Sequence, residues 1–256
     1  MRDFRSILYI VGLLLCIEAI AMLFPMIFDI AHRNPDWQIF FFSSLITFII
    51  GLVLYFSFKN QKRKIRIREA FVLTVFSWII VALFASLPFV YSSSHLNFTD
   101  AFFESISGIT TTGASVITNL DQLSEGILIW RSLLQWFGGI GIIVLALAIL
   151  PTLQIGGMQL LHMEHDDPYE KTLPKITQFV FEILTIYFLL TFTCGILYFV
   201  AGMTGFDAVA HAMTTIATGG FSTHNNSFQS FDSINIELIC ILFMIVGSLP
   251  FVLYLK

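Results

Sequence analysis

Charged residues are scarce in this chain of 256 residues: they make up 12% of it, whereas 57% of the residues are hydrophobic and 28 are phenylalanine. A water-soluble chain of this length could not bury so much apolar surface, so the composition excludes an ordinary soluble protein. The net charge of -4 is too small to suggest a nucleic-acid partner. Cysteine is also rare, and the three cysteines lie in apolar runs without paired spacing, which argues against a disulfide framework and against a zinc site. They are Cys16, Cys194 and Cys240.

Long apolar runs are what the chain has instead. A membrane-spanning helix needs about 20 consecutive, mostly apolar residues. Six such runs cover residues 4–28, 37–58, 70–91, 127–150, 176–201 and 234–255. Glu18 lies inside the first run, where an acid is costly, so we expect it to face other helices in a structural role. The sequence therefore predicts an all-α polytopic membrane protein with six transmembrane helices.

Lysine and arginine are distributed unevenly between the connections, and this predicts the orientation. With a cytoplasmic N-terminus, only Arg33 and Arg131 fall outside. The basic residues that then fall inside are Arg2, Arg5, Lys59, Lys62, Arg63, Lys64, Arg66, Arg68, Lys171, Lys175 and Lys256. Basic residues near span ends remain in the cytoplasm, so the bias predicts a cytoplasmic N-terminus. The basic run over residues 59–68 is also expected to contact anionic membrane lipid.

One stretch of the chain occurs twice. Residues 100–115, DAFFESISGITTTGAS, have a degenerate copy in residues 207–222, DAVAHAMTTIATGGFS. In this alignment Gly113 matches Gly220, and Glu104 is replaced by His211. Each copy stands between two apolar runs on the same predicted outer side, so the chain contains a parallel internal repeat.

Each copy begins with a helical segment that is too short to cross a bilayer. With Asp100 as the N-cap, the first helix is predicted over residues 101–109, and the second over residues 207–216. We expect two re-entrant half-helices, each followed by irregular backbone that is tolerated at membrane depth only where it is buried in protein or lines a watery cavity. The residues of this backbone are Thr110, Thr111, Thr112 and Gly113 in the first copy and Ala217, Thr218, Gly219 and Gly220 in the second.

The chemistry of these loops favours a cation. The C-terminal end of a helix carries the negative end of its dipole, and here it is aimed at the loop. Glycine at Gly113 permits a backbone angle that turns neighbouring carbonyls toward one axis. Because Glu104 and His211 differ in charge and shape, we expect them to brace the half-helices from behind and not to touch the ion. Gly138 and Gly139 are expected to allow close helix contact, with a gating hinge as the weaker alternative.

These units resemble the helix–pore-helix–filter–helix repeats of the Trk, Ktr and HKT potassium transporter superfamily. The resemblance is carried by GITTTGAS, WFGGIGIIVLALAILP, IGGMQLL and TIATGGFSTHNNS, and it is most detailed for the N-terminal half of the bacterial Trk-type potassium uptake subunits. It implies potassium uptake through a selectivity filter of backbone carbonyls at the eight loop residues named above. It implies no enzyme activity and no cofactor beyond bound potassium, and the glycines at both filter positions favour potassium over sodium.

The resemblance also implies four repeats around one pore, a cytoplasmic nucleotide-binding regulatory subunit and a place in the bacterial inner membrane. This chain has two repeats, so we expect it to be a fragment of a longer chain, the alternative being that two copies assemble face to face as a homodimer. We divide it into two N-terminal spans with a basic loop (residues 1–69), a first pore repeat (70–150), a cytoplasmic connection (151–175) and a second pore repeat (176–256).

Two other functions remain open on the sequence. Because only half a pore is present, the chain could be a non-conducting structural or regulatory membrane subunit. An intramembrane enzyme would have to use the acidic and histidine cluster between the repeats, and its spacing matches neither H-E-x-x-H nor H-x-x-E-H. The cluster consists of His162, Glu164, His165, Asp166 and Asp167. We therefore expect a solvated loop there and no enzyme.

Overall fold

The computed structural model describes residues 5–59, 67–153 and 172–255, and every regular element in these ranges is a helix. The α-helices are α1 (Arg5–Ala21), α2 (Leu23–Ala31), α3 (Trp37–Phe58), α4 (Ile67–Ala85), α5 (Leu87–Tyr91), α6 (Phe98–Ile109), α7 (Glu125–Leu153), α9 (Thr172–Val200), α10 (Gly205–Ile216) and α11 (Ile234–Ser248). Three short 3-10 helices are η1 (Leu120–Gln122), η2 (Ser227–Phe231) and η3 (Phe251–Leu255). The predicted all-α class is confirmed.

Within the part of the chain that the structure describes, four helical stretches are long and apolar enough to cross a membrane. They are Arg5–Ala31, Trp37–Phe58, Phe71–Tyr91 and Val180–Val200, with mean hydropathies between 2.1 and 2.6. Many of their large apolar side chains are exposed on the outside of the bundle, as a lipid-facing surface requires. The chain is therefore a membrane protein by the composition and length of its helices.

The last helix differs from its prediction. We expected one span over residues 234–255, but α11 ends at Ser248 and is 15 residues long. Pro250 explains the end, because a residue before proline is driven out of the helical region, and Leu249 has φ -71° and ψ 145°. The chain continues as η3 (Phe251–Leu255).

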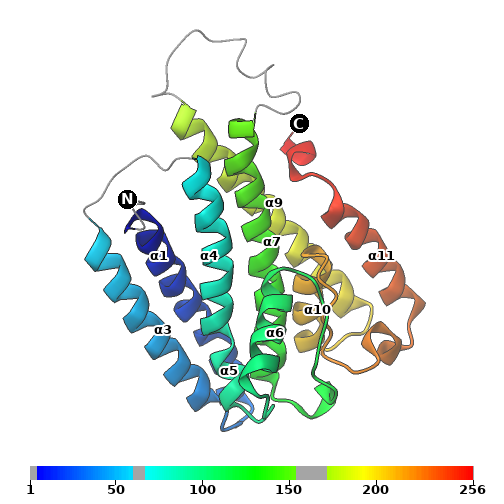
Figure 1. Ribbon diagram of the computed structural model, residues 1–256. Coiled ribbons are helices and arrows are strands. Elements are labelled where there is room, and N and C mark those ends of the chain that lie inside the picture. The colour runs from blue at the N-terminus through cyan, green and yellow to red at the C-terminus, as the bar shows by residue number, and fades with distance from the viewer. Residues whose placement is uncertain (1–4, 60–66, 154–171, 256) are drawn as a thin grey trace.

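The helices stand side by side in one bundle, with α7 in its centre (Figure 1). One buried cluster surrounds Trp130 of α7 and includes Phe40 and Phe89. A second surrounds Tyr187 and Tyr198 of α9 and extends to α10 and α11. Since α7 contacts both α6 and α10, it forms the wall that the two halves of the bundle share.

The ends of the long helices fall into two sets. Figure 1 shows the start of α1, the end of α3, the start of α4, the end of α7 and the start of α9 at one end of the bundle, where the C-terminus also lies. These are the helix ends predicted to face the cytoplasm. The short helices α6 and α10 lie toward the other half, and each packs against α7.

Candidate functional site

The two short helices α6 and α10 are built alike. Each has 12 residues, so each extends about 18 Å, well short of a hydrocarbon core of about 30 Å. Asn97 caps α6 by accepting a hydrogen bond from the amide of Asp100 (2.9 Å). Thr204 caps α10 by accepting from the amide of Asp207 (3.1 Å). The prediction of Asp100 as the N-cap is therefore wrong: it lies in the first turn, where its carboxylate complements the helix dipole.

Each of these helices is followed by a loop: loop 1 (residues 110–116) follows α6, and loop 2 (residues 217–223) follows α10. The backbones of the two loops have the same conformation where they leave the helix. In loop 1 the amide of Thr112 donates to the carbonyl of Ser107 (2.9 Å), and in loop 2 the amide of Gly219 donates to the carbonyl of Thr214 (2.9 Å). Such bonds back across the last turn satisfy carbonyls that a helix end leaves free.

Left-handed backbone occurs at the same two positions of each loop. Thr111 has φ 55° and Gly113 has φ 79°, while Thr218 has φ 51° and Gly220 has φ 84°. A β-branched residue in this region is strained, by about 1–2 kcal/mol, and persists only where the surroundings hold it. The repeat seen in the sequence is thus a repeat of an unusual backbone conformation as well.

The two loops touch through their glycines. A Cβ atom placed on Gly113 would collide with the carbonyl oxygen of Gly219, so the missing side chain is what allows the loops to meet. A Cβ on Gly220 would meet nothing within 4 Å. The structure therefore brings the two predicted groups of four residues together at one point of contact.

A single face of α7 lies behind both loops. The residues on this face are Arg131, Gln135, Gly138 and Gly139. Their spacing places them along one side of the helix. A Cβ on Gly138 would collide with the carbonyl oxygen of Ile109, the last residue of α6. A Cβ on Gly139 would lie 3.4 Å from the Cα atom of Ala217, directly after α10. The two glycines thus permit the close helix contact that was expected of them.

Arg131 ties both loops together from this face. Its Nε donates to Oε1 of Glu104 (2.8 Å), and the two side chains are 1% and 0% exposed. Its Nη1 donates to the carbonyl of Ser222 (2.9 Å), and its Nη2 to the hydroxyl of Ser115 (3.1 Å). The guanidinium carbon also lies 4.1 Å from the ring centroid of Phe221. In the sequence, Arg131 is notable only as one of the two basic residues on the predicted outer side.

Glu104 and His211 occupy equivalent places behind the two loops. Glu104 accepts from the hydroxyl of Ser115 (3.0 Å), and His211 Nε2 lies 2.9 Å from the hydroxyl of Ser222. His211 Nδ1 lies 2.9 Å from the carbonyl of Asp207, and a carbonyl can only accept, so Nδ1 carries the proton. Each residue holds the serine at the matching position of its own loop, as expected of a brace.

A polar connection joins the segments beyond the two loops. Asp121 Oδ1 lies 2.8 Å from Nδ1 of His224, and its Oδ2 accepts from the side-chain amide of Asn225 (2.6 Å). The hydrogen bond with His224 lowers the pKa of Asp121. Asn225 in turn accepts from the backbone amide of Leu120 (2.9 Å). Sequence reasoning gave no role to Gln135, Asp121, His224 or Asn225.

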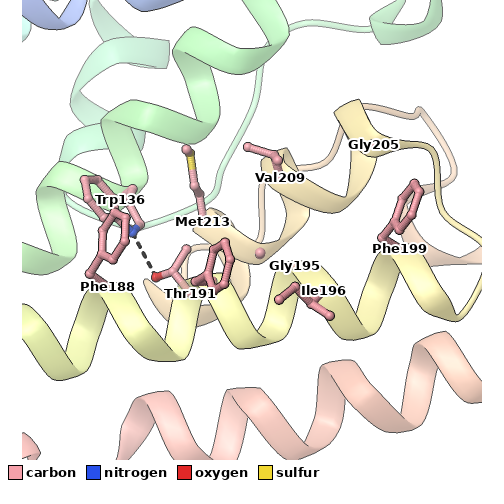
Figure 2. Close-up of a pocket in the computed structure, with 11 residues that line it drawn as sticks. Trp136, Phe188, Thr191, Gly195, Ile196, Phe199, Gly205, Val209 and Met213 are labelled. Carbon is pink, nitrogen blue, oxygen red and sulfur yellow. Dashed lines mark hydrogen bonds between the residues drawn. The ribbon is translucent and has the colours of Figure 1, made fainter.

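A separate groove of about 360 Å³ lies between α9 and α10. Figure 2 shows Phe188, Ile196 and Phe199 of α9 along one side of it, and Met213 of α10 opposite. Its polar side-chain groups are matched to each other, because Trp136 Nε1 donates to the hydroxyl of Thr191 (3.0 Å). The rest of the lining is apolar, so the groove has no ligand for an ion.

The His162–Asp167 cluster considered for an enzyme lies outside the described residues, as does most of the basic run after α3. Among the residues that are described, no three histidine, cysteine or acidic side chains are grouped so that they could hold a metal ion.

Comparison with known proteins gives one consistent family. The sequence model of the family TrkH, described as a cation transport protein, matches residues 37–256. The Trk system potassium uptake protein TrkH of Vibrio parahaemolyticus is 42% identical over 98% of this chain and 53% of its own length. The protein of the same name from Escherichia coli K12 is 42% identical over 96% of this chain and 51% of its own.

A solved structure agrees with this result. The crystal structure of the potassium transporter TrkH from Vibrio parahaemolyticus matches with a TM-score of 0.89 at 40% identity, over 99% of this chain and 51% of the other. The chain therefore spans about half the length of the relatives it matches.

Proposed function

Because the chain belongs to the TrkH family of cation transport proteins, we propose that it forms part of a potassium-selective pore in which loop 1 and loop 2 supply two of the coordinating segments. This is a family of transporters and not of enzymes. The single observation that carries the proposal is the direct contact of the two loops at Gly113 and Gly219, from repeats that lie far apart in the sequence.

The coordinating groups in this proposal are backbone carbonyls. A potassium ion leaves water only if oxygen atoms replace its hydration shell. The residues proposed to supply them are Thr110, Thr111, Thr112, Gly113, Ala217, Thr218, Gly219 and Gly220. None of the eight carries a charge, so the attraction must come from oxygen dipoles and from the negative ends of α6 and α10.

The surrounding helices fit a membrane pore with re-entrant segments. In this reading α1–α2, α3, α4–α5, α7, α9 and α11 cross the membrane, and α6 and α10 enter it and return. Irregular backbone such as loop 1 and loop 2 is tolerated there because protein covers it on the side of α7.

Two loops supply only half of the segments that the four-repeat arrangement needs. We propose that the rest comes from further repeats in the same polypeptide, since the potassium uptake proteins that this chain resembles are about twice as long. A cytoplasmic N-terminus, a bacterial inner-membrane location, a nucleotide-binding regulatory subunit and a homodimer stay predictions.

Glycine substitutions test the proposal. In the full-length protein, expressed in a bacterium without its own potassium uptake, Gly113→Ala should abolish rubidium uptake, because the new Cβ meets Gly219 and φ is 79°. Gly220→Ala adds only the backbone cost of about 1–2 kcal/mol and should reduce uptake less. Gly205→Ala is the control, since its Cβ would meet nothing within 4 Å and its φ is not left-handed.

Uptake by Gly113→Ala at the parental rate and with parental discrimination against sodium would contradict the pore. A non-conducting structural or regulatory subunit predicts instead that the parental protein gives this bacterium no rubidium uptake.

A further inference from the structure

The side chain of Gln135 lies fully buried between the two loops. It is 0% exposed, and its Oε1 accepts a hydrogen bond from the backbone amide of Phe221 (3.1 Å). An amide N–H can be met only by an oxygen, so this bond fixes which end of the carboxamide faces Phe221. The nitrogen Nε2 must therefore point the other way.

The carboxamide of Gln135 lies against the contact between the glycines. A Cβ built on Gly219 would collide with Cδ and Oε1 of Gln135 and would lie 2.7 Å from Nε2, and a Cβ built on Gly113 would lie 3.7 Å from Nε2. The missing side chain of Gly219 is thus what leaves room for the carboxamide. Gln135 reaches the point where loop 1 and loop 2 meet.

Nε2 of Gln135 has no hydrogen-bond partner among the described residues. Buried side-chain donors are rarely left unpaired, and such a group calls for a structural or functional reason. The backbone of loop 1 at Gly113 and that of loop 2 at Gly219 lie beside Nε2, and a bound water can bridge such a donor to a backbone carbonyl that lies too far for a direct bond.

Arg131 does not already fill this role. It lies one helical turn earlier on α7 and binds the two loops at their far ends, at Ser115 and Ser222. Gln135 lies at the glycines themselves, where a change in separation would alter the spacing of the carbonyls.

We propose that Gln135 is a positioning residue that sets cation selectivity, by fixing the separation of loop 1 and loop 2 at Gly113 and Gly219. The inference rests on the proposed function, because it assumes that these loops coordinate the ion. Discrimination between potassium and sodium depends on the geometry and number of the coordinating oxygens. A neutral carboxamide can hold that geometry from behind without placing a charge beside the ion.

The test replaces Gln135 in the full-length protein, expressed in a bacterium without its own potassium uptake. Gln135→Met has nearly the same length but offers neither the acceptor for the Phe221 amide nor the Nε2 donor, and Gln135→Asn keeps the carboxamide on a shorter side chain. Gln178→Met is the matched control, because Gln178 is exposed on α9 and bonds only to Glu182 among the described contacts. Rubidium uptake is measured against competing potassium and sodium, with the amount of protein in the membrane.

We expect Gln135→Met to raise sodium uptake relative to potassium at least tenfold and to change the KM for rubidium more than the maximal rate. Gln135→Asn should show a smaller change of the same kind, and Gln178→Met none. A purely structural role would lower the amount of protein or the maximal rate and leave the sodium-to-potassium ratio unchanged.

The inference is overturned if Gln135→Met keeps the parental ratio of sodium to potassium uptake. If Gln135→Met does not reach the membrane, the parental ratio in Gln135→Asn overturns the inference instead. An equal change in Gln178→Met would overturn it as well. The two proposals fail separately: a fully active Gly113→Ala rejects the pore, whereas an inactive Gly113→Ala with parental selectivity in Gln135→Met rejects only the role of Gln135.

Discussion

Replacing Arg131 with methionine should loosen the junction between loop 1 and loop 2. The substitution removes one member of a buried ion pair, which typically costs about 3–5 kcal/mol because the other charge is left without compensation. Glu104 would still accept from Ser115 and from the amide of Val116 (3.0 Å). We therefore expect a cost at the lower end of that range, about 3 kcal/mol, for Arg131→Met.

Replacing Glu104, the other member of the ion pair, should lower the stability more than Arg131→Met does. In Glu104→Gln the guanidinium of Arg131 is left with neutral acceptors, among them the carbonyl of Ser222 and the hydroxyl of Ser115, and these cannot balance its charge. We expect about 4 kcal/mol for this variant. In the double variant neither charge remains, so its cost should fall below the sum of the single costs by about 2–3 kcal/mol.

The measurement is the thermal stability of the purified full-length protein in detergent, together with rubidium uptake in cells. A cost of about 3 kcal/mol corresponds to a change of more than a hundredfold in the population of the ordered junction, so both readouts should respond. Arg33→Met is the control, because Arg33 is exposed in the turn after α2. Additive costs in the double variant, or a cost for Arg131→Met no larger than for Arg33→Met, would refute this account of the junction.

Two further substitutions test the support around the loops. Gly138→Ala should reduce both stability and uptake, because its Cβ collides with the carbonyl of Ile109, while Gly141→Ala on the same helix has room at 3.4 Å and should be neutral or slightly stabilising in a thermal-shift assay. Asp121→Asn should lower thermal stability at pH 6 but not at a pH low enough to protonate Asp121. The hydrogen bond with His224 lowers the pKa of Asp121, so its contribution is present above the ordinary pKa near 4 and is lost as the pH falls through the lowered pKa. Equal losses at both pH values would contradict this link.

The helical architecture could be predicted because long apolar runs have few alternatives in a membrane. The ends of the helices are harder to predict than their existence, because they depend on single residues that act locally. Pro250 ends α11 early, and Asn97 caps α6 three residues before Asp100, the predicted cap. Both signals are present in the sequence, but hydropathy alone gives them no weight.

The loops could be predicted from the comparison of the two copies, because the repeated threonine and glycine positions need unusual backbone. Their supports could not. Gln135 meets Phe221, and Asp121 meets His224, across long stretches of chain, and no periodicity encodes such contacts. The available signal was the presence of an arginine and a glutamine four residues apart in an otherwise apolar helix, where buried polar groups need partners.

The difference between Glu104 and His211 follows from the single helix that the two copies share. Arg131 neutralises Glu104 and at the same time reaches Ser222 in loop 2, so one guanidinium already serves both loops. An acid at position 211 would set a second buried carboxylate against the same cation and leave a net charge without compensation. A neutral histidine that shares a hydrogen bond with Ser222 braces loop 2 without that cost. The two copies therefore keep the same backbone while their braces differ in charge, because α7 supplies one cation for both.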